Sequence, residues 1–389
     1  MKNKILYIHP AIRSYRIDIF ELLSKKLNVD FFWSSGSKPG AQMIHRNEEI
    51  KRILNKTEIN YSQAKELKIL SIDNFSWELF KLPFKSYKVY IFSNITSVPY
   101  LLLSPILRVF RKKIILFDEL WRYPIEIGKY KYIYPYVRFL SKYCLDGVVV
   151  AGSAAEELYL KNFNVDSSKI FVAYNTTIDT KEIVSDLSLD LKTKKHLDTL
   201  TSKKRLLYLG RIVKYKGLDI LINSMRSITP EYDLVIVGDG DFKSECEDLV
   251  RKNNLDKRVF FLNGCLSNEA PYFYKNCDIF VLPTRFRLQD NVQVESWGFT
   301  VNEAMALEKP VITTSAVGSG YDLIIDEITG GLADAGDSIS LAKKINYVIK
   351  NNINNKIGKK ARRHLMSICD HNKNIVTYQR VIQKALDEK

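Results

Sequence analysis

The chain has 389 residues, 46% of them hydrophobic, and its formal net charge is +15. This length exceeds the size at which one hydrophobic core usually continues to grow, so two domains are expected. The five cysteines stand far apart without paired spacing, which argues against a disulfide framework or a zinc site and favours a reducing cytoplasm.

The first half of the chain alternates short apolar runs with helical stretches. A basic start, Met1–Lys4, precedes an apolar run that ends at His9, which favours a first buried strand over a signal peptide. Residues 15–27 have the apolar spacing of an amphipathic helix, and residues 34–66 are polar and loop-rich. The strands expected here are Lys4–Ile8, Val29–Trp33, Val89–Phe92, Ile114–Phe117, Gly147–Ala151 and Ile170–Tyr174.

A basic and aromatic segment stands out in this half. Residues 108–142 hold nine Lys or Arg against three acids, interleaved with aromatic side chains, which suits an anionic membrane face. The preceding residues 98–110 are apolar but too short to span a bilayer, so no transmembrane helix is predicted. The alternative is a buried helix followed by an ordinary solvated face. The cations concerned are Arg108, Arg111, Lys112, Lys113, Lys129, Lys131 and Arg138.

The second half repeats a strand and helix unit after a linker over residues 180–204. Helical stretches at Leu218–Ser227 and Lys243–Lys252 follow two of its strands. Repeated units of this kind predict a parallel sheet that binds ligands at the carboxyl ends of its strands. The strands expected here are Leu206–Leu209, Leu234–Val237, Val259–Leu262, Ile279–Leu282 and Val311–Thr314.

Two cations follow the first strand of the second half. The apolar run ends in Gly210-Arg211, and Lys216 follows within the same loop. Fixed Arg and Lys side chains in a partly dry cleft stabilise the charge that a diphosphate leaving group develops. Alone, both could be solvated loop cations.

A pair of glutamates lies farther along the chain. Glu295 and Glu303 are separated by seven residues and precede the apolar Ala304-Met305-Ala306. If one continuous helix carries them, both lie on roughly one face. A carboxylate that accepts two hydrogen bonds suits ribose hydroxyls, and Gly298 would let backbone N–H groups approach an anion.

These elements together resemble the donor domain of retaining glycosyltransferases of the GT-B fold, family 4 (glycosyl transferases group 1). Six elements occur in the family's order over about 125 residues: Gly210-Arg211 to Lys216-Gly217, Gly238-Asp239-Gly240, Glu295 to Glu303, Pro310-Val311-Ile312, Val317-Gly318 and Gly330-Gly331-Leu332. The first half of the chain matches the family far less well.

The resemblance implies an α/β protein with two Rossmann-like domains facing across a cleft. Residues 1–180 would bind the acceptor, residues 181–358 would bind the donor, and a helical region at 359–389 would pack back toward the first domain. The donor-binding residues implied are Arg211, Lys216, Gly238, Gly240, Gly298, Phe299, Thr300 and Glu303. Catalysis would use Arg211, Lys216 and Glu295, which orients sugar hydroxyls, with no metal and no cofactor.

Two departures from the family pattern concern the first half. The loop after the first strand, from His9 to Arg16, lacks the glycine pair that usually lies near the donor phosphates. After the fourth strand, Asp118 and Glu119 stand where many members have a histidine next to the reacting carbon. Asp118 is therefore a candidate catalytic residue, with a structural salt bridge as the alternative.

The function expected is that of a metal-independent, retaining hexosyltransferase. It would move a sugar from a UDP- or GDP-sugar to a lipid-linked or polysaccharide acceptor, as a cytoplasmic protein peripheral to the inner face of the membrane. A GT-B epimerase or phosphorylase would share the site. A basic nucleic-acid-binding protein would explain the net charge of +15 but not the ordered motifs, so no nucleic-acid partner is expected.

Overall fold

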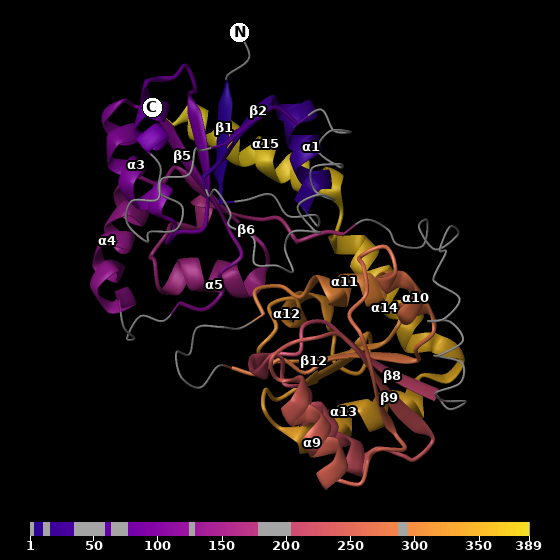
Figure 1. Ribbon diagram of the computed structural model, residues 1–389. Coiled ribbons are helices and arrows are strands. Elements are labelled where there is room, and N and C mark those ends of the chain that lie inside the picture. Colours follow the sequence, from indigo (N-terminus) through magenta and orange to yellow (C-terminus); the bar gives the residue numbers. More distant parts are fainter. Residues whose placement is uncertain are drawn as a thin grey trace. The chain divides into compact units, whose positions relative to one another are not determined.

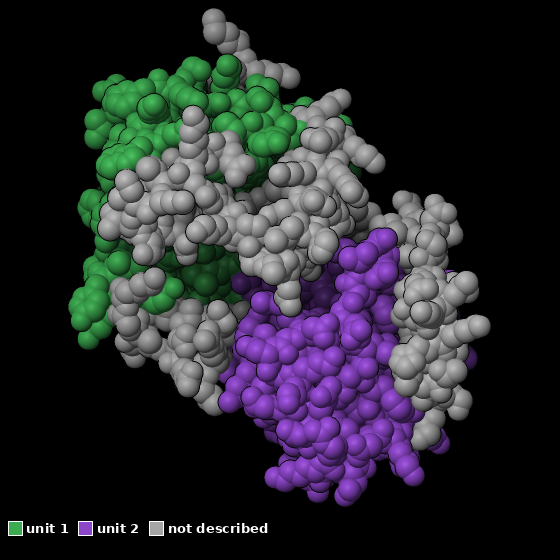
Figure 2. Space-filling view, viewed as in Figure 1, with its two compact units in different colours: residues 1–174, 371–389 green, residues 175–370 purple. Residues whose placement is uncertain are grey.

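The computed structural model describes residues 4–10, 16–34, 59–63, 77–123, 129–177, 204–286 and 295–388. The chain forms two compact units, one of residues 1–174 and 371–389 and one of residues 175–370 (Figure 2). Residues 180–203 of the expected linker, most of the loop-rich residues 34–66, and the side chain of Lys129 lie outside the described part. Lys204, the last residue of the expected linker, begins a strand instead.

Unit 1 is built on one parallel sheet (Figure 1). The strand order is β3-β2-β1-β4-β5-β6-β7, which reverses direction along the sheet between β1 and β4. Each expected strand of this half is present, and β3 is an additional edge strand. The strands are β1 (Ile5–His9), β2 (Val29–Trp33), β3 (Tyr61–Gln63), β4 (Val89–Ser93), β5 (Lys113–Asp118), β6 (Gly147–Val150) and β7 (Ile170–Val172).

Helices cover both faces of this sheet, because alternate strand residues point to opposite faces. Leu6 and Ile8 belong to one buried cluster, whereas Ile5 and Tyr7 belong to another that includes residues of α1 and α15. The helices are α1 (Ile17–Leu27), η2 (Trp77–Phe84), α3 (Val98–Val109), α4 (Lys129–Tyr143), α5 (Ser153–Lys161), η3 (Ser167–Lys169) and α15 (His371–Asp387).

The apolar segment 98–110 forms α3, which is largely a core helix. Tyr100, Leu103 and Leu107 are fully buried in the first cluster, whereas Leu102, Val109 and Phe110 are exposed. Most of this segment is therefore a buried helix, which was the alternative to a membrane-facing segment. Within the described residues, no helix is both long enough and apolar enough to cross a bilayer.

Unit 2 carries the second parallel sheet, in the order β10-β9-β8-β11-β12-β13. This is the order of a doubly wound nucleotide-binding sheet. Its strands are β8 (Lys204–Leu209), β9 (Tyr232–Val237), β10 (Val259–Leu262), β11 (Ile279–Leu282), β12 (Val311–Thr314) and β13 (Gly330–Ala333). Its helices are η5 (Lys214–Lys216), α8 (Leu218–Ser224), η6 (Met225–Ser227), α9 (Lys243–Lys252), α10 (Ala270–Lys275), α11 (Phe299–Ala306), α12 (Gly320–Leu323), α13 (Ser338–Asn351), η7 (Ile353–Asn355) and α14 (Lys356–Ile368).

The C-terminal helical region divides between the units. Helix α14 packs against α11 in unit 2, whereas α15 packs against α1, β5 and β6 in unit 1. The unit boundaries fall after Tyr174 and after Asp370, so the part of the predicted region 359–389 that belongs to unit 1 begins at His371.

Candidate functional site

The candidate site lies where the strand order of the second sheet reverses, between β8 and β11. Loops that leave adjacent parallel strands in opposite directions open a crevice at this point, where ligands of such sheets bind. The loops after β8, β9, β11 and β12 carry the residues predicted from the sequence.

The loops after β8 and β9 are packed backbone to backbone. Gly210 N–H donates to the Val237 carbonyl at 3.0 Å, and Ile212 N–H donates to the Asp239 carbonyl at 2.9 Å. A Cβ atom on Gly238 would collide with the Gly210 carbonyl, and one on Gly240 with the Ile212 carbonyl. The two glycines therefore fix the loop that carries Arg211, while their direct contact with a ligand stays a prediction.

Tyr215 lies between the two predicted phosphate-binding cations. The exposed Arg211 guanidinium donates from Nη2 to the Tyr215 hydroxyl at 2.8 Å, and the Lys216 Nζ lies 5.8 Å from the centroid of the Tyr215 ring. The Arg211 carbonyl accepts a hydrogen bond from the Tyr208 hydroxyl at 2.6 Å. The structure thus brings Arg211 and Lys216 to one short turn, as the sequence predicted.

Arg285, which follows β11, holds this turn in place. Its backbone N–H donates to the Tyr215 carbonyl at 2.9 Å, and its Nε donates to the Lys214 carbonyl at 3.1 Å. Its guanidinium also pairs with Asp219 at 3.0 Å. The sequence analysis missed this role because no local spacing connects Arg285 to a turn that lies some 70 positions earlier.

Lys216 forms an ion pair with Glu295, and both side chains are mostly buried. The two residues are 79 positions apart, so neither local pattern predicted the contact. A parallel bridge to Val317 holds the Glu295 backbone, with hydrogen bonds to the Ala316 carbonyl at 3.0 Å and from Gly318 N–H at 2.9 Å. The Glu295 carboxylate therefore fixes the position of the Lys216 ammonium in the candidate site.

The expectation that one helix carries both glutamates is wrong. Glu295 lies in the β-bridge to Val317, before the helix begins. Between Glu295 and α11, Gly298 adopts a left-handed φ of 90°. A Cβ atom at Gly298 would lie 3.0 Å from a Leu282 methyl carbon and 3.2 Å from one of Val317. The chain therefore needs glycine here to turn into the helix.

Helix α11 begins at Phe299 and Thr300, directly after this turn. The first N–H groups of a helix have no partner within the helix, and its amino end carries partial positive charge. Both residues were predicted to contact the donor through such groups, and their position at the start of α11 fits that prediction.

Glu303 lies within α11 and is partly buried. Its Oε2 accepts a hydrogen bond from the Tyr274 hydroxyl of α10 at 2.7 Å. Desolvation raises the pKa of the Glu303 carboxyl to about 7, although the Tyr274 hydroxyl opposes the shift by stabilising the carboxylate. Among the described residues, no group donates a hydrogen bond to Oε1, which leaves this atom as an acceptor for a ligand.

Asn302 is a further residue of the site that the sequence analysis missed. Its Oδ1 accepts from the Trp297 indole N–H at 2.8 Å, and its Nδ2 donates to the Asn175 carbonyl at 2.8 Å. All three residues are buried. Asn302 thereby ties the turn before α11 to the segment where the chain enters unit 2. The sequence does hold one sign of this role, because Asn302 is a polar residue among the apolar residues of α11.

Asp118 and Glu119 follow β5 in unit 1. The buried Asp118 carboxylate accepts hydrogen bonds from Ile95 N–H at 3.0 Å, Leu120 N–H at 2.9 Å and the Tyr159 hydroxyl at 2.7 Å. Burial raises the pKa of Asp118 to about 6. These three donors indicate a structural role for Asp118, although it forms no salt bridge within the described residues.

Glu119 forms the salt bridge in this region. Its partner is Arg16, whose guanidinium also lies 4.5 Å from the centroid of the Phe117 ring. His9 ends β1 and makes edge contacts with the rings of Phe20 and Trp33. Of the loop that lacks the family's glycine pair, residues 11–15 lie outside the described part.

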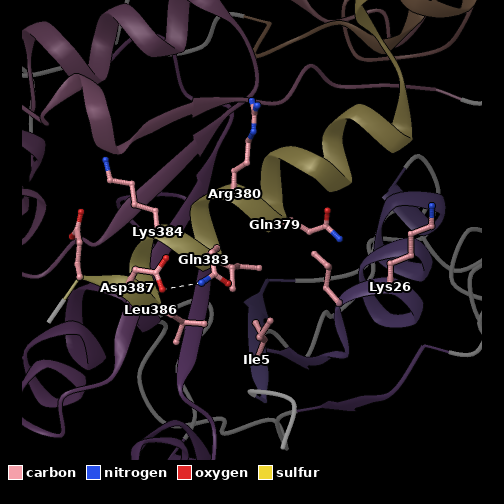
Figure 3. A pocket seen from close by; sticks show the side chains of 11 residues that line it. Ile5, Lys26, Gln379, Arg380, Gln383, Lys384, Leu386 and Asp387 are labelled. Atoms are coloured by element: carbon pink, nitrogen blue, oxygen red, sulfur yellow. Dashed lines mark hydrogen bonds between the residues drawn. The ribbon is translucent and has the colours of Figure 1, made fainter.

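A pocket in unit 1 runs along α15, beside Ile5 and Lys26 (Figure 3). Ile5 is the first residue of β1, so the pocket lies at the amino edge of the first sheet. Ligands of doubly wound sheets bind at the carboxyl edge, and the pocket is therefore not the candidate site. In the described ranges, no three His, Cys, Asp or Glu side chains lie together in a way that could hold a metal ion.

The two sheets and their strand orders define a two-domain α/β protein of the GT-B fold. HepE of Anabaena, solved in complex with UDP, superposes with a TM-score of 0.77 over 98% of this chain and 99% of that chain. The two sequences are 16% identical, so this likeness concerns the fold. The fold class predicted from the sequence is confirmed.

Residues 191–364 match the model of the family described as Glycosyl transferases group 1. An uncharacterized glycosyltransferase of Methanocaldococcus jannaschii is 29% identical over 198 residues, which are 50% of this chain and 48% of that protein. The capsular polysaccharide biosynthesis glycosyltransferase CapM of Staphylococcus aureus is 32% identical over 151 residues, 36% of each chain. This chain spans about half the length of the curated relatives that it matches first.

Proposed function

We propose that the protein is a retaining glycosyltransferase that moves a hexose from a UDP- or GDP-sugar to a lipid-linked or polysaccharide acceptor at the cytoplasmic face of a membrane. The observation that carries the proposal is the Lys216–Glu295 ion pair beside Arg211, at the strand-order reversal of the second sheet. The match of residues 191–364 to the glycosyl transferases group 1 family model supports it.

The charges of the site suit a diphosphate better than a neutral ligand. Glu295 compensates part of the Lys216 charge, whereas the exposed Arg211 guanidinium donates to a neutral hydroxyl. The amino end of α11 adds partial positive charge. A bound diphosphate would therefore meet Arg211, Lys216 and the first N–H groups of α11, which stabilise the charge that develops as the sugar leaves.

The carboxylates have separate tasks in this proposal. The Oε1 atom of Glu303 accepts the ribose hydroxyls, while Tyr274 holds Oε2 and fixes the plane of the carboxylate. Glu295 orients the sugar hydroxyls and at the same time positions the Lys216 ammonium for the phosphate. Gly238 and Gly240 contribute by fixing the Arg211 loop, since their lack of Cβ atoms permits its close packing.

The proposed transfer breaks the bond between the sugar C1 and the phosphate oxygen and forms a bond between C1 and the acceptor oxygen on the same face. The acceptor proton passes to the departing phosphate oxygen, so the protein supplies no separate base. Asp118 is left out of this step because its carboxylate already accepts three hydrogen bonds. Arg211 and Lys216 supply the positive charge that a metal would otherwise bring.

Nucleoside-diphosphate release tests the proposal. The protein is incubated with UDP-glucose or GDP-mannose, with and without membrane-extracted lipid acceptors, in buffer that contains EDTA. Release of UDP or GDP that requires acceptor and persists in EDTA is expected. Donor conversion without acceptor would instead indicate an epimerase, and dependence on inorganic phosphate would indicate a phosphorylase. No reaction with any nucleotide sugar, together with salt-sensitive oligonucleotide binding, would overturn the proposal.

The relatives narrow the choice of first substrates. CapM is described as a capsular polysaccharide biosynthesis glycosyltransferase, and HepE was solved with UDP. Uridine-based donors and polysaccharide precursors are therefore the first combination to assay.

A further inference from the structure

Helix α4 has an outward face that nothing in the described structure covers. Four aromatic side chains are exposed along it: Tyr132 by 82%, Tyr136 by 41%, Phe139 by 51% and Tyr143 by 53%. Their spacing of four, three and four residues places them in one stripe along the helix. An adjacent face is fixed to the core by Val137 and Leu140, which are fully buried, so the helix is held in this rotation.

The exposed face of α4 also carries positive charge without compensation. Four of its 15 residues are Lys or Arg, and none is Asp or Glu. Lys131, Arg138 and Lys142 are exposed, and none pairs with an acid in the described part of the chain. Lys142 instead lies 5.1 Å from the centroid of the Tyr143 ring. Cations and aromatic rings therefore share one surface.

The stripe is held in place by the neighbouring helix. The Tyr136 hydroxyl donates to the Leu101 carbonyl of α3 at 2.8 Å, and α3 packs against α4. Leu102, the next residue of α3, is also exposed. Figure 1 shows both helices at the outer edge of unit 1. The aromatic surface is thus ordered before any partner binds.

Helix α14 of unit 2 provides an internal comparison. It is more basic than α4, with five Lys or Arg among its 13 residues, and it also lacks acids. Lys356, Lys359 and Arg363 are exposed, but Met366 is its one large exposed hydrophobic side chain among the described residues. Charge alone therefore does not distinguish α4. The combination of tyrosines with Lys and Arg does, because rings with one polar end prefer the level of lipid headgroups, where cations meet anionic lipid.

We propose that α4 docks on an anionic membrane surface, with Tyr132, Tyr136, Phe139 and Tyr143 at headgroup level and Lys131, Arg138 and Lys142 beside acidic lipids. This inference deepens the proposed function, since it names the element that would bring the enzyme to a lipid-linked acceptor.

The structure also revises the prediction that all the cations of residues 108–138 face a membrane. Arg108 and Lys113 contact Asp146, and Lys112 donates to the carbonyls of Lys85 and Tyr87, so those cations serve the fold.

Co-sedimentation of the full chain with vesicles tests the docking. Vesicles of phosphatidylcholine alone are compared with vesicles of equal parts phosphatidylcholine and phosphatidylglycerol, at low and at high salt. Binding is expected with the anionic vesicles only, and it should weaken with salt. The triple variant Lys131→Ser, Arg138→Ser, Lys142→Ser should bind roughly tenfold or more weakly, given the usual attraction of single cations to such surfaces.

The matched control removes the same charge from α14, through Lys356→Ser, Lys359→Ser and Arg363→Ser. This variant should bind vesicles like the wild type, and Tyr132→Ser with Phe139→Ser should weaken vesicle binding at unchanged charge.

Equal losses of vesicle binding in both triple variants, or no vesicle binding by the wild type, would overturn the proposal. So would a dimer in sedimentation that the Tyr132 and Phe139 changes dissociate, because a second copy would then cover the stripe. The α4 variants should bind UDP or GDP as the wild type does. If the wild type bound vesicles but neither nucleotide, the proposed function would be contradicted and the docking would not.

Discussion

The Lys216 ammonium has two anionic partners in this account, Glu295 in the free protein and the diphosphate in the complex. The ion pair to Glu295 is mostly buried and spans two loops, so it sets the position of the ammonium before a donor arrives. Preorganised charge of this kind stabilises a leaving group without further rearrangement. Arg211 differs, because its guanidinium is exposed and bound only to a tyrosine hydroxyl among the described residues.

Removal of either cation should therefore slow transfer. Arg211→Ala and Lys216→Ala are each expected to lower kcat by roughly a hundredfold or more, the scale of losing one preorganised charge stabiliser. The control is Lys214→Ala, since Lys214 is exposed in the same turn and forms no ion pair among the described residues. Steady-state release of the nucleoside diphosphate measures the effect. Near-normal turnover in both alanine variants would remove these cations from the mechanism.

The two glutamates should separate in binding experiments. Glu303→Gln is expected to weaken the binding of the nucleoside diphosphate itself, because the ribose loses its carboxylate acceptor. Glu295→Gln should spare the nucleotide and weaken the binding of the intact nucleotide sugar. Calorimetry with UDP and with UDP-glucose, or with the corresponding guanosine pair, distinguishes the two. Equal losses in both variants would reject the assigned roles.

Nucleotide binding should also depend on pH through Glu303. Burial raises the pKa of this carboxyl to about 7, so below that pH the group is protonated and one of its oxygens becomes a donor, which weakens it as an acceptor for ribose hydroxyls. Affinity is expected to rise as the pH rises through about 7 and then to level off. The Glu303→Gln variant is the control for titration of the phosphate groups. A pH profile that is the same in wild type and variant would show that Glu303 does not titrate in the complex.

At the scale of secondary structure, the sequence located the strands of both sheets because strands buried on both faces are apolar runs. The exceptions have physical causes. β3 is a three-residue edge strand, and β13 begins with two glycines, so neither has the expected composition. The helix predicted for both glutamates failed at Gly298, because a left-handed residue breaks the continuity that the spacing assumed.

The contacts between distant residues could not be predicted from local patterns. Lys216 and Glu295 were each identified, but their ion pair depends on the sheet order that brings β8 beside β11. Asn302 was missed because its partners, Trp297 and Asn175, become neighbours only in the folded unit.

The turn before α11 should be sensitive to Asn302. Asn302→Leu leaves the Trp297 indole N–H and the Asn175 carbonyl buried without their hydrogen bonds, which is expected to cost about 1–3 kcal/mol of stability for each group. The variant should have a lower Tm and weaker nucleotide binding, both measurable in one thermal-shift titration. The control is Asn346→Ala, which removes an exposed hydrogen bond to the Ser227 carbonyl. An unchanged Tm for Asn302→Leu would show that this buried network does not support the turn.

At the scale of the whole molecule, the net charge of +15 has at least two distinct uses in this account. In unit 2, Arg211 and Lys216 face the candidate diphosphate site, whereas in unit 1 the unpaired cations of α4 lie beside exposed aromatic rings. Residues 191–364 match a family model, whereas the first half of the chain lies outside that match. The acceptor is therefore the part of the function that rests least on resemblance.

The proposed function requires that the second sheet bind a nucleoside diphosphate between β8 and β11. Calorimetric titration of the full chain with UDP and GDP in EDTA measures this binding. Saturable binding of at least one diphosphate is predicted for the wild type and for Lys214→Ala, with binding lost or strongly weakened in the double variant Arg211→Ala, Lys216→Ala. Absence of binding to both nucleotides, or equal affinity in the double variant, would show that Arg211 and Lys216 do not form a nucleoside-diphosphate site.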